Sequence, residues 1–315
     1  MSTDFSYIGL LVFDSILQSS KMQVAVYSQY LKEGDLPYVQ QLFDTLADAG
    51  LAASVFAPYL DTIRDQVTFR AEPGTFNGHW DLQKQSFDFL ITLGGDGTIL
   101  AAMTLVREAE IPILGINLGK LGFLATVNKN RIVEAIGLLL EDRYVISSRR
   151  ILHLDADPPL FGEIPFALND FTILKRDTSS MITIHAYIDG AYLNTYWADG
   201  IILSTPTGST GYSLSCGGPV VFPNSNNFVL TPVGPHNLNM RPIVISDSSV
   251  VSFEVEGRLD NYLCTLDSRH ELISSVNKLS LRRGDFVVNI IQLYDGGFPS
   301  TIRNKLAWGV DLRNH

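Results

Sequence analysis

The sequence predicts a chain of two domains: an N-terminal α/β domain with a parallel sheet, then a mainly antiparallel, β-sandwich-like domain. Up to about residue 146, apolar strand-like runs alternate with segments of helical periodicity, the pattern of a parallel sheet covered by helices. From residue 147 on, strand-like runs follow one another with few helical patterns between them, which is typical of an antiparallel domain. A chain of 315 residues has room for two such cores.

The α/β domain is predicted over residues 22–146. Its strands are short apolar runs, and its helices are segments whose apolar residues recur every three to four positions. The predicted strands are 24–28, 53–56, 87–93 and 113–116, and the predicted helices are 38–49, 99–107 and 132–141. Ligands of such sheets bind beyond the carboxyl ends of the strands, so we expect a site there.

The β-rich domain is predicted over residues 147–294. Residues 182–188 alternate apolar and polar side chains, and Asp189-Gly190 supplies a two-residue hairpin turn. Further strands are predicted at 150–155, 167–174, 201–204, 228–232, 250–255 and 286–291. Residues 295–315 form a last segment with helical character at 299–308, which we expect to pack back on the first domain.

Residues 1–21 are interpreted as an appended or poorly ordered N-terminal extension. The apolar run 5–13 resembles the core of a signal peptide, but Asp4 is the only charged residue before it and no small-residue cleavage site follows. Met22 directly precedes the first predicted strand. We therefore expect translation to begin naturally at Met22.

The composition excludes several classes of function. The chain has 23 basic and 33 acidic residues, a net charge of −10, which disfavours nonspecific binding to nucleic acid or to anionic lipid. Its apolar runs are shorter than the roughly eighteen residues that a membrane span needs. Cys216 and Cys264 stand in apolar surroundings and are interpreted as buried thiols in a reducing compartment. These features predict a cytoplasmic protein that binds neither nucleic acid nor membrane.

A glycine turn at Gly94–Thr98 separates a predicted buried strand from a predicted helix. This layout turns backbone N–H groups and a helix N-terminus toward an anion, and glycines let a phosphate approach the backbone. Asp96 puts a negative charge at the centre of the turn. Its carboxylate would accept a proton from a hydroxyl or hold a metal beside the phosphates. The structural alternative is a tight turn in which Asp96 caps the helix.

Two familiar nucleotide-binding patterns do not fit. Residues 115–121 resemble a P-loop, but the spacing is one residue short and Leu121 replaces the Ser or Thr that binds magnesium. Residues 95–100 lack the third glycine of the dinucleotide fingerprint. The six histidines are scattered without ligand spacing, so the sequence predicts no metal site held by the protein.

The glycine turn occurs in 6-phosphofructokinases, diacylglycerol kinases and NAD kinases, and the motifs that follow it narrow the choice. They are 115–124 (GINLGKLGFL), Asn169-Asp170, Asp199-Gly200, 205–212 (TPTGSTGY) and 235–242 (PHNLNMRP). In this order they resemble the NAD kinase family over about residues 22–308. The resemblance implies phosphorylation of the 2′-hydroxyl of the adenosine ribose of NAD by ATP. It also implies an NAD-binding β-rich domain and a homodimer or homotetramer.

The resemblance also implies a role for each matching residue. Asp96 would accept or orient the ribose hydroxyl, with Mg²⁺ or another divalent cation arriving with ATP. Around the phosphates it implies Gly94, Gly95, Gly97 and Thr98, and around the dinucleotide Phe123, Asn169, Asp170, Asp199, Thr207, Gly208, Thr210, Gly211 and Tyr212. Asn169 and Asp170 would contact ribose hydroxyls, because an amide and a carboxylate can together donate to and accept from a diol.

Further implied contacts concern the two ends of the dinucleotide. Thr207 and Tyr212 would lie near the adenine, and Asp199 beside the nicotinamide amide. Asp267-Ser268-Arg269 stands where many members have an Asp-Gly turn, so Arg269 is assigned no site role. Two other functions stay open: a lipid kinase of the diacylglycerol type, and a nonenzymatic sensor of NAD(H).

Overall fold

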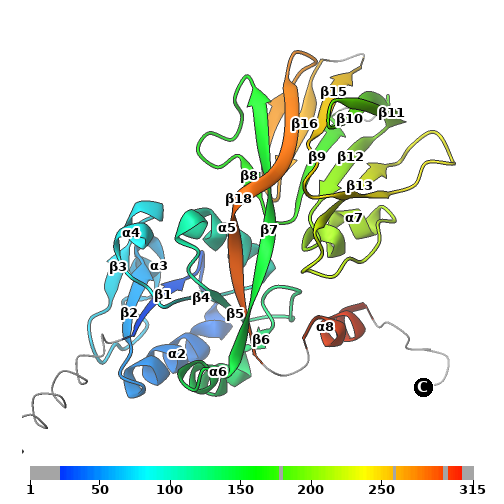
Figure 1. Cartoon of the computed structure of the whole chain (residues 1–315). Coiled ribbons are helices and arrows are strands. Elements are labelled where there is room, and N and C mark those ends of the chain that lie inside the picture. The colour runs from blue at the N-terminus through cyan, green and yellow to red at the C-terminus, as the bar shows by residue number, and fades with distance from the viewer. Residues whose placement is uncertain (1–21, 177–179, 258–259, 294–296, 307–315) are drawn as a thin grey trace, which may run out of the picture.

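The computed structural model describes residues 22–176, 180–257, 260–293 and 297–306. These residues form two lobes that meet along a pair of long strands (Figure 1). A sheet of twelve strands runs through both lobes, and a six-stranded sheet packs against it in the C-terminal lobe of the described chain. The predicted pairing of an α/β domain with a mainly antiparallel β domain is confirmed. The predicted extension, residues 1–21, lies outside the described residues.

The N-terminal lobe contains five parallel strands in the order β5-β4-β1-β2-β3. The strands are β1 (Gln23–Tyr27), β2 (Ala52–Phe56), β3 (Gly74–Phe76), β4 (Phe89–Leu93), β5 (Ile113–Asn117) and a short β6 (Val127–Asn128) beside β5. The helices are α2 (Leu36–Asp48), α3 (Ala57–Ile63), α4 (His79–Lys84), α5 (Asp96–Val106) and α6 (Ile132–Leu140). Helices α3 and α4 are missing from the prediction, because both are too short to show a helical period.

Strands β4 and β5 lie in the middle of this sheet, and every residue in them is buried. This explains why both read as continuous apolar runs rather than alternating ones. Helices α2 and α6 contribute to a hydrophobic cluster with residues of β1 and β4, whereas α5 contributes to a second cluster. The second cluster also takes in Ile151, Phe166 and Phe286 from outside the predicted α/β domain. The two lobes therefore share part of their core.

The C-terminal lobe packs its two sheets face to face around a third hydrophobic cluster. Its strands are β8 (Phe166–Ala167), β9 (Asp170–Lys175), β10 (Ile182–Ile188), β11 (Ala191–Ala198), β12 (Gly200–Ser204), β13 (Asn227–Val233), β14 (Ile243–Ser246), β15 (Val251–Glu256), β16 (Tyr262–Leu266) and β17 (Arg269–Ile273). The hairpin β10–β11 turns at Asp189 and Gly190, whose φ angles are 51° and 79°. Positive φ at both positions is what a type I′ turn requires, so the predicted hairpin is confirmed.

Strands β7 (Tyr144–Asp157) and β18 (Lys278–Leu293) join the lobes. They pair antiparallel with each other over nearly their whole length, with an irregularity between Arg283 and Val287. One end of β18 pairs with β15 in the C-terminal lobe, and near its other end Ile290 lies beside Ile113 of β5. The boundary that we placed between residues 146 and 147 falls inside β7.

The last described segment is α8 (Gly297–Leu306). It lines a cleft together with residues of the loop that follows β5, and it lies below the C-terminal lobe in Figure 1. The Phe298 ring also contacts the Phe222 ring of the C-terminal lobe, at 5.3 Å between centroids.

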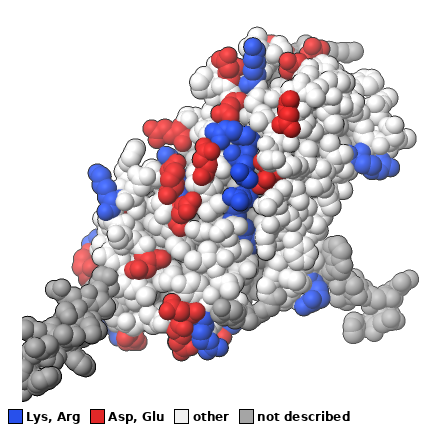
Figure 2. Space-filling view, in the orientation of Figure 1, with Lys and Arg blue, Asp and Glu red and all other residues white. Residues whose placement is uncertain are grey.

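Both cysteines are free thiols. Cys264 is buried, as expected, but Cys216 is only half-buried, and the expectation of burial for it is wrong. Cys216 directly follows the short helix α7 (Tyr212–Ser215), which begins with an exposed tyrosine at the molecular surface. The face seen in Figure 2 mixes acidic and basic side chains, with basic ones gathered near the junction of the lobes.

Candidate active site

The glycine turn lies at the carboxyl end of β4, between β1 and β5. Gly94 has φ +154°, and a Cβ there would lie 2.1 Å from Thr98 Oγ1, so the tight turn requires glycine. The Gly94 N–H donates to the Ile116 carbonyl at 3.0 Å, which ties the turn to β5. A Cβ on Gly95 or Gly97 would meet no atom within 4 Å, so this side of the turn is open to a ligand. The structure therefore places Gly94–Thr98 at the N-terminus of α5, as an anion-binding turn needs.

The Asp96 carboxylate holds the loop that follows β5. Its Oδ2 accepts the Phe123 N–H at 2.8 Å, and its Oδ1 accepts the N–H groups of Leu124 at 3.1 Å and Ala125 at 2.9 Å. The carboxylate lies so close to Gly122 that a Cβ on that glycine would be 1.7 Å from Oδ1. The sequence predicted a chemical role for this carboxylate but not this attachment.

These bonds leave the Asp96 carboxylate with capacity for substrate. A carboxylate has about four acceptor positions, and the three N–H groups occupy two on Oδ1 and one on Oδ2. One position on Oδ2 therefore stays available for a hydroxyl. Because the side chain is fixed by backbone donors, it would meet a substrate hydroxyl in a set orientation.

Asn169 and Asp170 stand at an interruption between β8 and β9. The predicted strand 167–174 is wrong here, because Leu168 and Asn169 leave the strand. The cause is Asp267, whose carboxylate accepts the N–H groups of Leu168 at 2.9 Å, Asn169 at 2.8 Å and Asp170 at 3.2 Å. This bend takes Asn169 out of the strand, half-buried, and leaves Asp170 buried at the start of β9.

Asp170 is only 8% exposed. Burial, with a smaller contribution from the Asp267 charge, raises the pKa of Asp170 to about 7. Its Oδ2 lies 3.7 Å from the position that a Cβ on Gly211 would take, so the carboxylate faces the loop after β12. Asp170 is thus a titratable group at neutral pH within the predicted binding residues.

The loop 205–211 closes over this pair. The Thr205 N–H donates to the Asn169 carbonyl at 2.9 Å, and its hydroxyl donates to the Leu168 carbonyl at 2.6 Å. Further bonds shape the short helical turn η4 (Gly208–Thr210), from Gly208 N to Thr205 Oγ1 at 3.1 Å and from Thr210 Oγ1 to the Thr207 carbonyl at 3.3 Å. Thr207, Gly208, Thr210 and Gly211 therefore lie beside Asn169 and Asp170.

Tyr212 and Asp199 complete this group. Tyr212 is exposed at the start of α7, and the partial burial of its phenol, then the neighbouring Cys216 and to a smaller extent the charges of Asp199 and Asp170, raise the pKa of that phenol. Asp199, between β11 and β12, forms an ion pair with Lys175 at 2.5 Å. The sequence missed Lys175, and a basic residue at the end of a strand gives little signal of such a partner.

A second residue that the sequence missed is Arg149, on β7. It is 2% exposed, and its Nη1 is 3.5 Å from Thr207 Oγ1, a long hydrogen bond. Within the described residues its Nε has no partner, and burial lowers the pKa of the guanidinium to about 10, so it stays charged at neutral pH. The available signal was an arginine at a position of β7 that alternation directs inward.

The predicted residues thus form two groups, one in each lobe. The first is Gly94–Thr98 with Phe123, and the second comprises Asn169, Asp170, Asp199 and the loop ending at Tyr212. Leu124 and Ala125, which Asp96 holds, share one hydrophobic cluster with Leu168, which precedes Asn169. Phe123 itself is half-buried. The Asp96 attachment and the Asp267 bend therefore each involve residues of one hydrophobic cluster.

Within the described ranges, no group of three or more His, Cys, Asp or Glu side chains could hold a metal ion. No helix in this part of the chain is long and apolar enough to cross a membrane.

Comparison with known proteins finds a matching family domain for each lobe. Residues 28–144 match the model of the ATP-NAD kinase N-terminal domain, and residues 168–293 match that of the C-terminal domain. The chain is 44% identical to an NAD kinase of Cytophaga hutchinsonii over 294 residues, 93% of this chain and 100% of that one. It is also 44% identical to an NAD kinase of Flavobacterium psychrophilum, again over 93% of this chain and 100% of the relative.

The fold is shared with a solved structure of a more distant protein. The crystal structure of yeast NADH kinase complexed with NADH superposes with a TM-score of 0.83 at 22% identity, covering 95% of this chain and 91% of that one. The domain matches and the full-length relatives agree with the order of motifs along the chain. This chain belongs to the NAD kinase family.

Proposed function

We propose that this protein is an NAD kinase, which transfers the γ-phosphoryl group of ATP to the 2′-hydroxyl of the adenosine ribose of NAD. The observation that supports this most directly is the placement of Asp96. Its carboxylate is fixed by three backbone N–H groups and retains an acceptor position, and Leu124 and Ala125, which it holds, share a hydrophobic cluster with Leu168, the residue before Asn169. The products are NADP and ADP.

The reaction needs a base, charge stabilisation and orientation. Asp96 Oδ2 accepts the proton of the 2′-hydroxyl, the ribose oxygen bonds to the γ-phosphorus, and the bond from that phosphorus to the bridging oxygen of ADP breaks. Backbone N–H groups of Gly94–Thr98 and the N-terminus of α5 stabilise the phosphate charge. Magnesium enters as the Mg–ATP substrate, and it neutralises charge on the phosphates.

The second lobe selects the dinucleotide. Asn169 and Asp170 bind ribose hydroxyls, Thr207 and Tyr212 lie near the adenine, and Asp199 lies beside the nicotinamide amide. We further propose a cytoplasmic homodimer or homotetramer, with residues 147–294 as the NAD-binding domain and residues 22–146 supplying Asp96.

An assay with ATP, Mg²⁺ and NAD tests this function directly. NADP should accumulate with the wild-type protein, and Asp96→Asn should lose activity roughly a hundredfold or more while still binding NAD. Asparagine is a suitable variant because its single oxygen can keep the bonds to Leu124 and Ala125. A parallel reaction with diacylglycerol vesicles in place of NAD tests the lipid-kinase alternative.

Folded wild-type protein that binds NAD but forms no NADP would be a sensor, and the proposed activity would be wrong. Phosphorylated lipid in the vesicle reaction would contradict it equally. Full turnover in Asp96→Asn would remove Asp96 from the chemistry.

A further inference from the structure

A two-residue turn, Asp267-Ser268, joins β16 to β17, and Arg269 is the first residue of β17. We call residues 267–269 the 267–269 turn. Asp267 has φ +53°, a left-handed conformation that aspartate, asparagine and glycine adopt more readily than other residues. The proposed function gives this turn no role, although two of its side chains bond to the segment that carries Asn169 and Asp170.

Asp267 bonds to this segment through its side chain and through its backbone. Its carboxylate accepts the N–H groups of Leu168, Asn169 and Asp170, and its own N–H donates to the Asp170 carbonyl at 3.0 Å. Asp267 therefore bonds to both backbone polar groups of Asp170. Hydrogen bonds from a carboxylate to three successive N–H groups are charge-assisted, and together they fix the direction of the chain at this point.

Arg269 holds the same segment on the other side of the bend. Its guanidinium donates to the carbonyl groups of Ile164 and Phe166, and it lies over the Phe166 ring at 5.8 Å from the centroid. The planar fork of a guanidinium suits two acceptors at once. One hairpin turn therefore holds residues 164–170 at both ends, with a carboxylate for the N–H groups and a guanidinium for the carbonyls.

The bonds at Leu168 and Asn169 continue into the loop 205–211. The Leu168 carbonyl accepts the Thr205 hydroxyl at 2.6 Å, and the Asn169 carbonyl accepts the Thr205 N–H at 2.9 Å. Gly208 lies against the same backbone, since a Cβ there would be 2.1 Å from the Asn169 carbonyl oxygen. Asp267 and Thr205 thus bond to opposite polar groups of the same two residues, and a shift of these residues would shift the loop.

We propose that the 267–269 turn is a positioning element for NAD, which acts by fixing the ribose-binding pair and the loop 205–211 in one arrangement. The inference rests on the proposed kinase activity and names residues outside the binding set that determine the affinity for the acceptor. A binding site that is already ordered loses less conformational freedom when the ligand binds. Without the turn contacts, NAD binding would have to order residues 168–170 and the loop as well.

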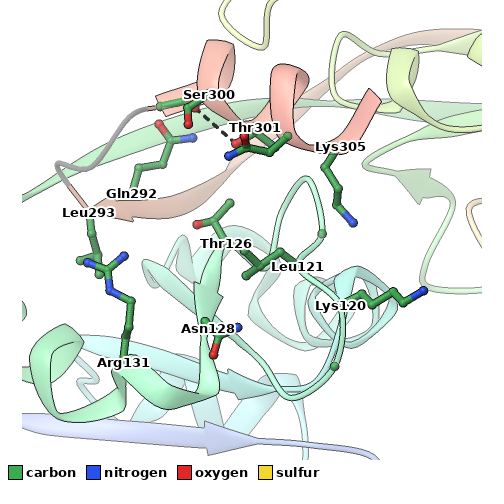
Figure 3. A pocket seen from close by; sticks show the side chains of 14 residues that line it. Lys120, Leu121, Thr126, Asn128, Arg131, Gln292, Leu293, Ser300, Thr301 and Lys305 are labelled. Atoms are coloured by element: carbon green, nitrogen blue, oxygen red, sulfur yellow. Dashed lines mark hydrogen bonds between the residues drawn. The ribbon is translucent and has the colours of Figure 1, made fainter. Parts of the chain in front are cut away.

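The reacting groups of the N-terminal lobe lie apart from this turn. The Asp96 loop borders a cleft at Gly122, between this loop and α8 (Figure 3). The described lining of that cleft comes from residues 119–131, from the end of β18 and from α8, and it includes neither the 267–269 turn nor residues 164–170. We therefore expect substitutions in the turn to change the KM for NAD and not the KM for ATP.

Asp267→Gly in the full-length protein removes the carboxylate and keeps the turn, because glycine adopts positive φ without strain. It leaves three N–H groups without their charged acceptor. We expect the KM for NAD, and the Kd for NAD measured by calorimetry, to rise about tenfold or more. The kcat at saturating NAD and the KM for ATP should stay within about threefold. Arg269→Met should raise the KM for NAD by a smaller factor.

Asp267→Asn separates the charge of Asp267 from its contacts. Asparagine tolerates positive φ and keeps one acceptor oxygen for the N–H groups of Asn169 and Asp170. The Asp267 charge contributes to the raised pKa of Asp170, and Tyr212 of α7 is the other titratable group coupled to Asp170. We expect the KM for NAD to rise less than in Asp267→Gly, and the pH midpoint of NAD binding to move to lower pH. A purely structural role would leave that midpoint where it is.

Asp189→Gly is the matched control. Asp189 stands at the same kind of turn in the β10–β11 hairpin, with φ +51°, and its carboxylate accepts the Val250 N–H at 2.8 Å. This turn lies at the opposite end of β11 from Ala198, which precedes Asp199. The substitution also removes a turn carboxylate that accepts a backbone N–H, and its KM for NAD should match the wild type.

An unchanged KM for NAD in folded Asp267→Gly overturns the positioning role and leaves the kinase activity intact. An equal rise in the KM for ATP, or an equal rise in the KM for NAD of Asp189→Gly, does the same. If Asp267→Gly does not fold, the pH midpoint of Asp267→Asn decides, because an unmoved midpoint overturns the role. A wild type that binds NAD but forms no NADP overturns the kinase activity, and calorimetry with NAD then still measures the effect of the turn.

Discussion

Asp96 combines attachment of the 122–125 loop with the proposed proton transfer. Hydrogen bonds to a charged group contribute about 1.5 to 3 kcal/mol each, so three of them hold the loop firmly while a substrate hydroxyl occupies the last position on Oδ2. Because three hydrogen bonds join them, the loop and the carboxylate should move together. None of this was visible in the sequence, because Asp96 and its partners are 27 to 29 residues apart.

Asp170 predicts a pH dependence of NAD binding. Its folded pKa of about 7 lies above the usual value, so the carboxyl is protonated below that pH and ionised above it. An ionised carboxylate accepts hydrogen bonds on both oxygens, and we expect the KM for NAD to fall about tenfold between pH 6 and pH 8. Initial rates at varied NAD and saturating ATP measure it.

Asp170→Asn is the control for this pH dependence, since the amide does not titrate and should flatten the profile. Rising pH should strengthen NAD binding but lower the contribution of Asp170 to the stability of the fold. Because the folded protein holds this proton up to about pH 7, the contribution of Asp170 to stability falls as the pH rises from about 4 to 7. A KM for NAD that rises toward pH 8 in the wild type would contradict the role of the carboxylate.

Arg149 predicts separate effects on binding and on stability. Arg149 has no acidic partner among the residues that the structure describes, and a buried unpaired charge is costly, so Arg149→Met should leave Tm unchanged or raise it. The same substitution removes a positive charge beside Thr207, and the KM for the anionic dinucleotide should rise about tenfold.

Arg150→Met is the matched control for Arg149→Met. It lies next in β7 on the opposite face, and both its Tm and its KM for NAD should resemble the wild type. A lower Tm in Arg149→Met with an unchanged KM for NAD would make Arg149 a packing residue only.

Among the elements, the sequence was informative where the determinants are local. The β4–turn–α5 unit and the β10–β11 hairpin follow from glycine and aspartate at positions that require unusual φ. Strand β18 was predicted only at 286–291, because Arg282-Arg283-Gly284-Asp285 resembles a turn. In the structure the strand continues past an irregularity there, with Arg282 bound to Asp155 of β7 at 3.0 Å.

The bend at Asn169 was unpredictable for a related reason. It depends on Asp267, whose carboxylate lies about a hundred residues away in sequence and substitutes for strand pairing at three backbone N–H groups. Sequence pattern alone reports apolar periodicity, and residues 167–174 have enough of it to read as one strand. The motif predicts a binding pair at Asn169 and Asp170, and the local geometry of that pair depends on a partner far along the chain.

At the scale of the whole molecule, the shared sheet predicts one unfolding transition. The twelve-stranded sheet and the cluster containing Ile99, Ile151 and Val288 belong to both lobes, so neither lobe keeps its core when the other unfolds. Trp80 reports on the N-terminal lobe and Trp197 on the C-terminal lobe, and each indole packs against a histidine ring.

Two single-tryptophan variants test, by unfolding in urea, whether the two lobes unfold in one transition. Both carry Trp308→Phe, and one adds Trp80→Phe while the other adds Trp197→Phe. The two fluorescence transitions should have the same midpoint and the same slope with urea. Midpoints that differ beyond the shift in overall stability seen by circular dichroism would show that the lobes unfold independently.

The hydrogen bonds between Asp96 and the 123–125 backbone determine which amino-acid substitutions this loop can tolerate. All three donors are amide N–H groups of the backbone, which every amino acid except proline supplies. The half-buried side chain at 123 can therefore be exchanged without touching the attachment, whereas Leu124 and Ala125 are buried in the core and are constrained by packing. A proline at any one of these positions would remove one of the three hydrogen bonds, and a side chain added at Gly122 would clash with the carboxylate.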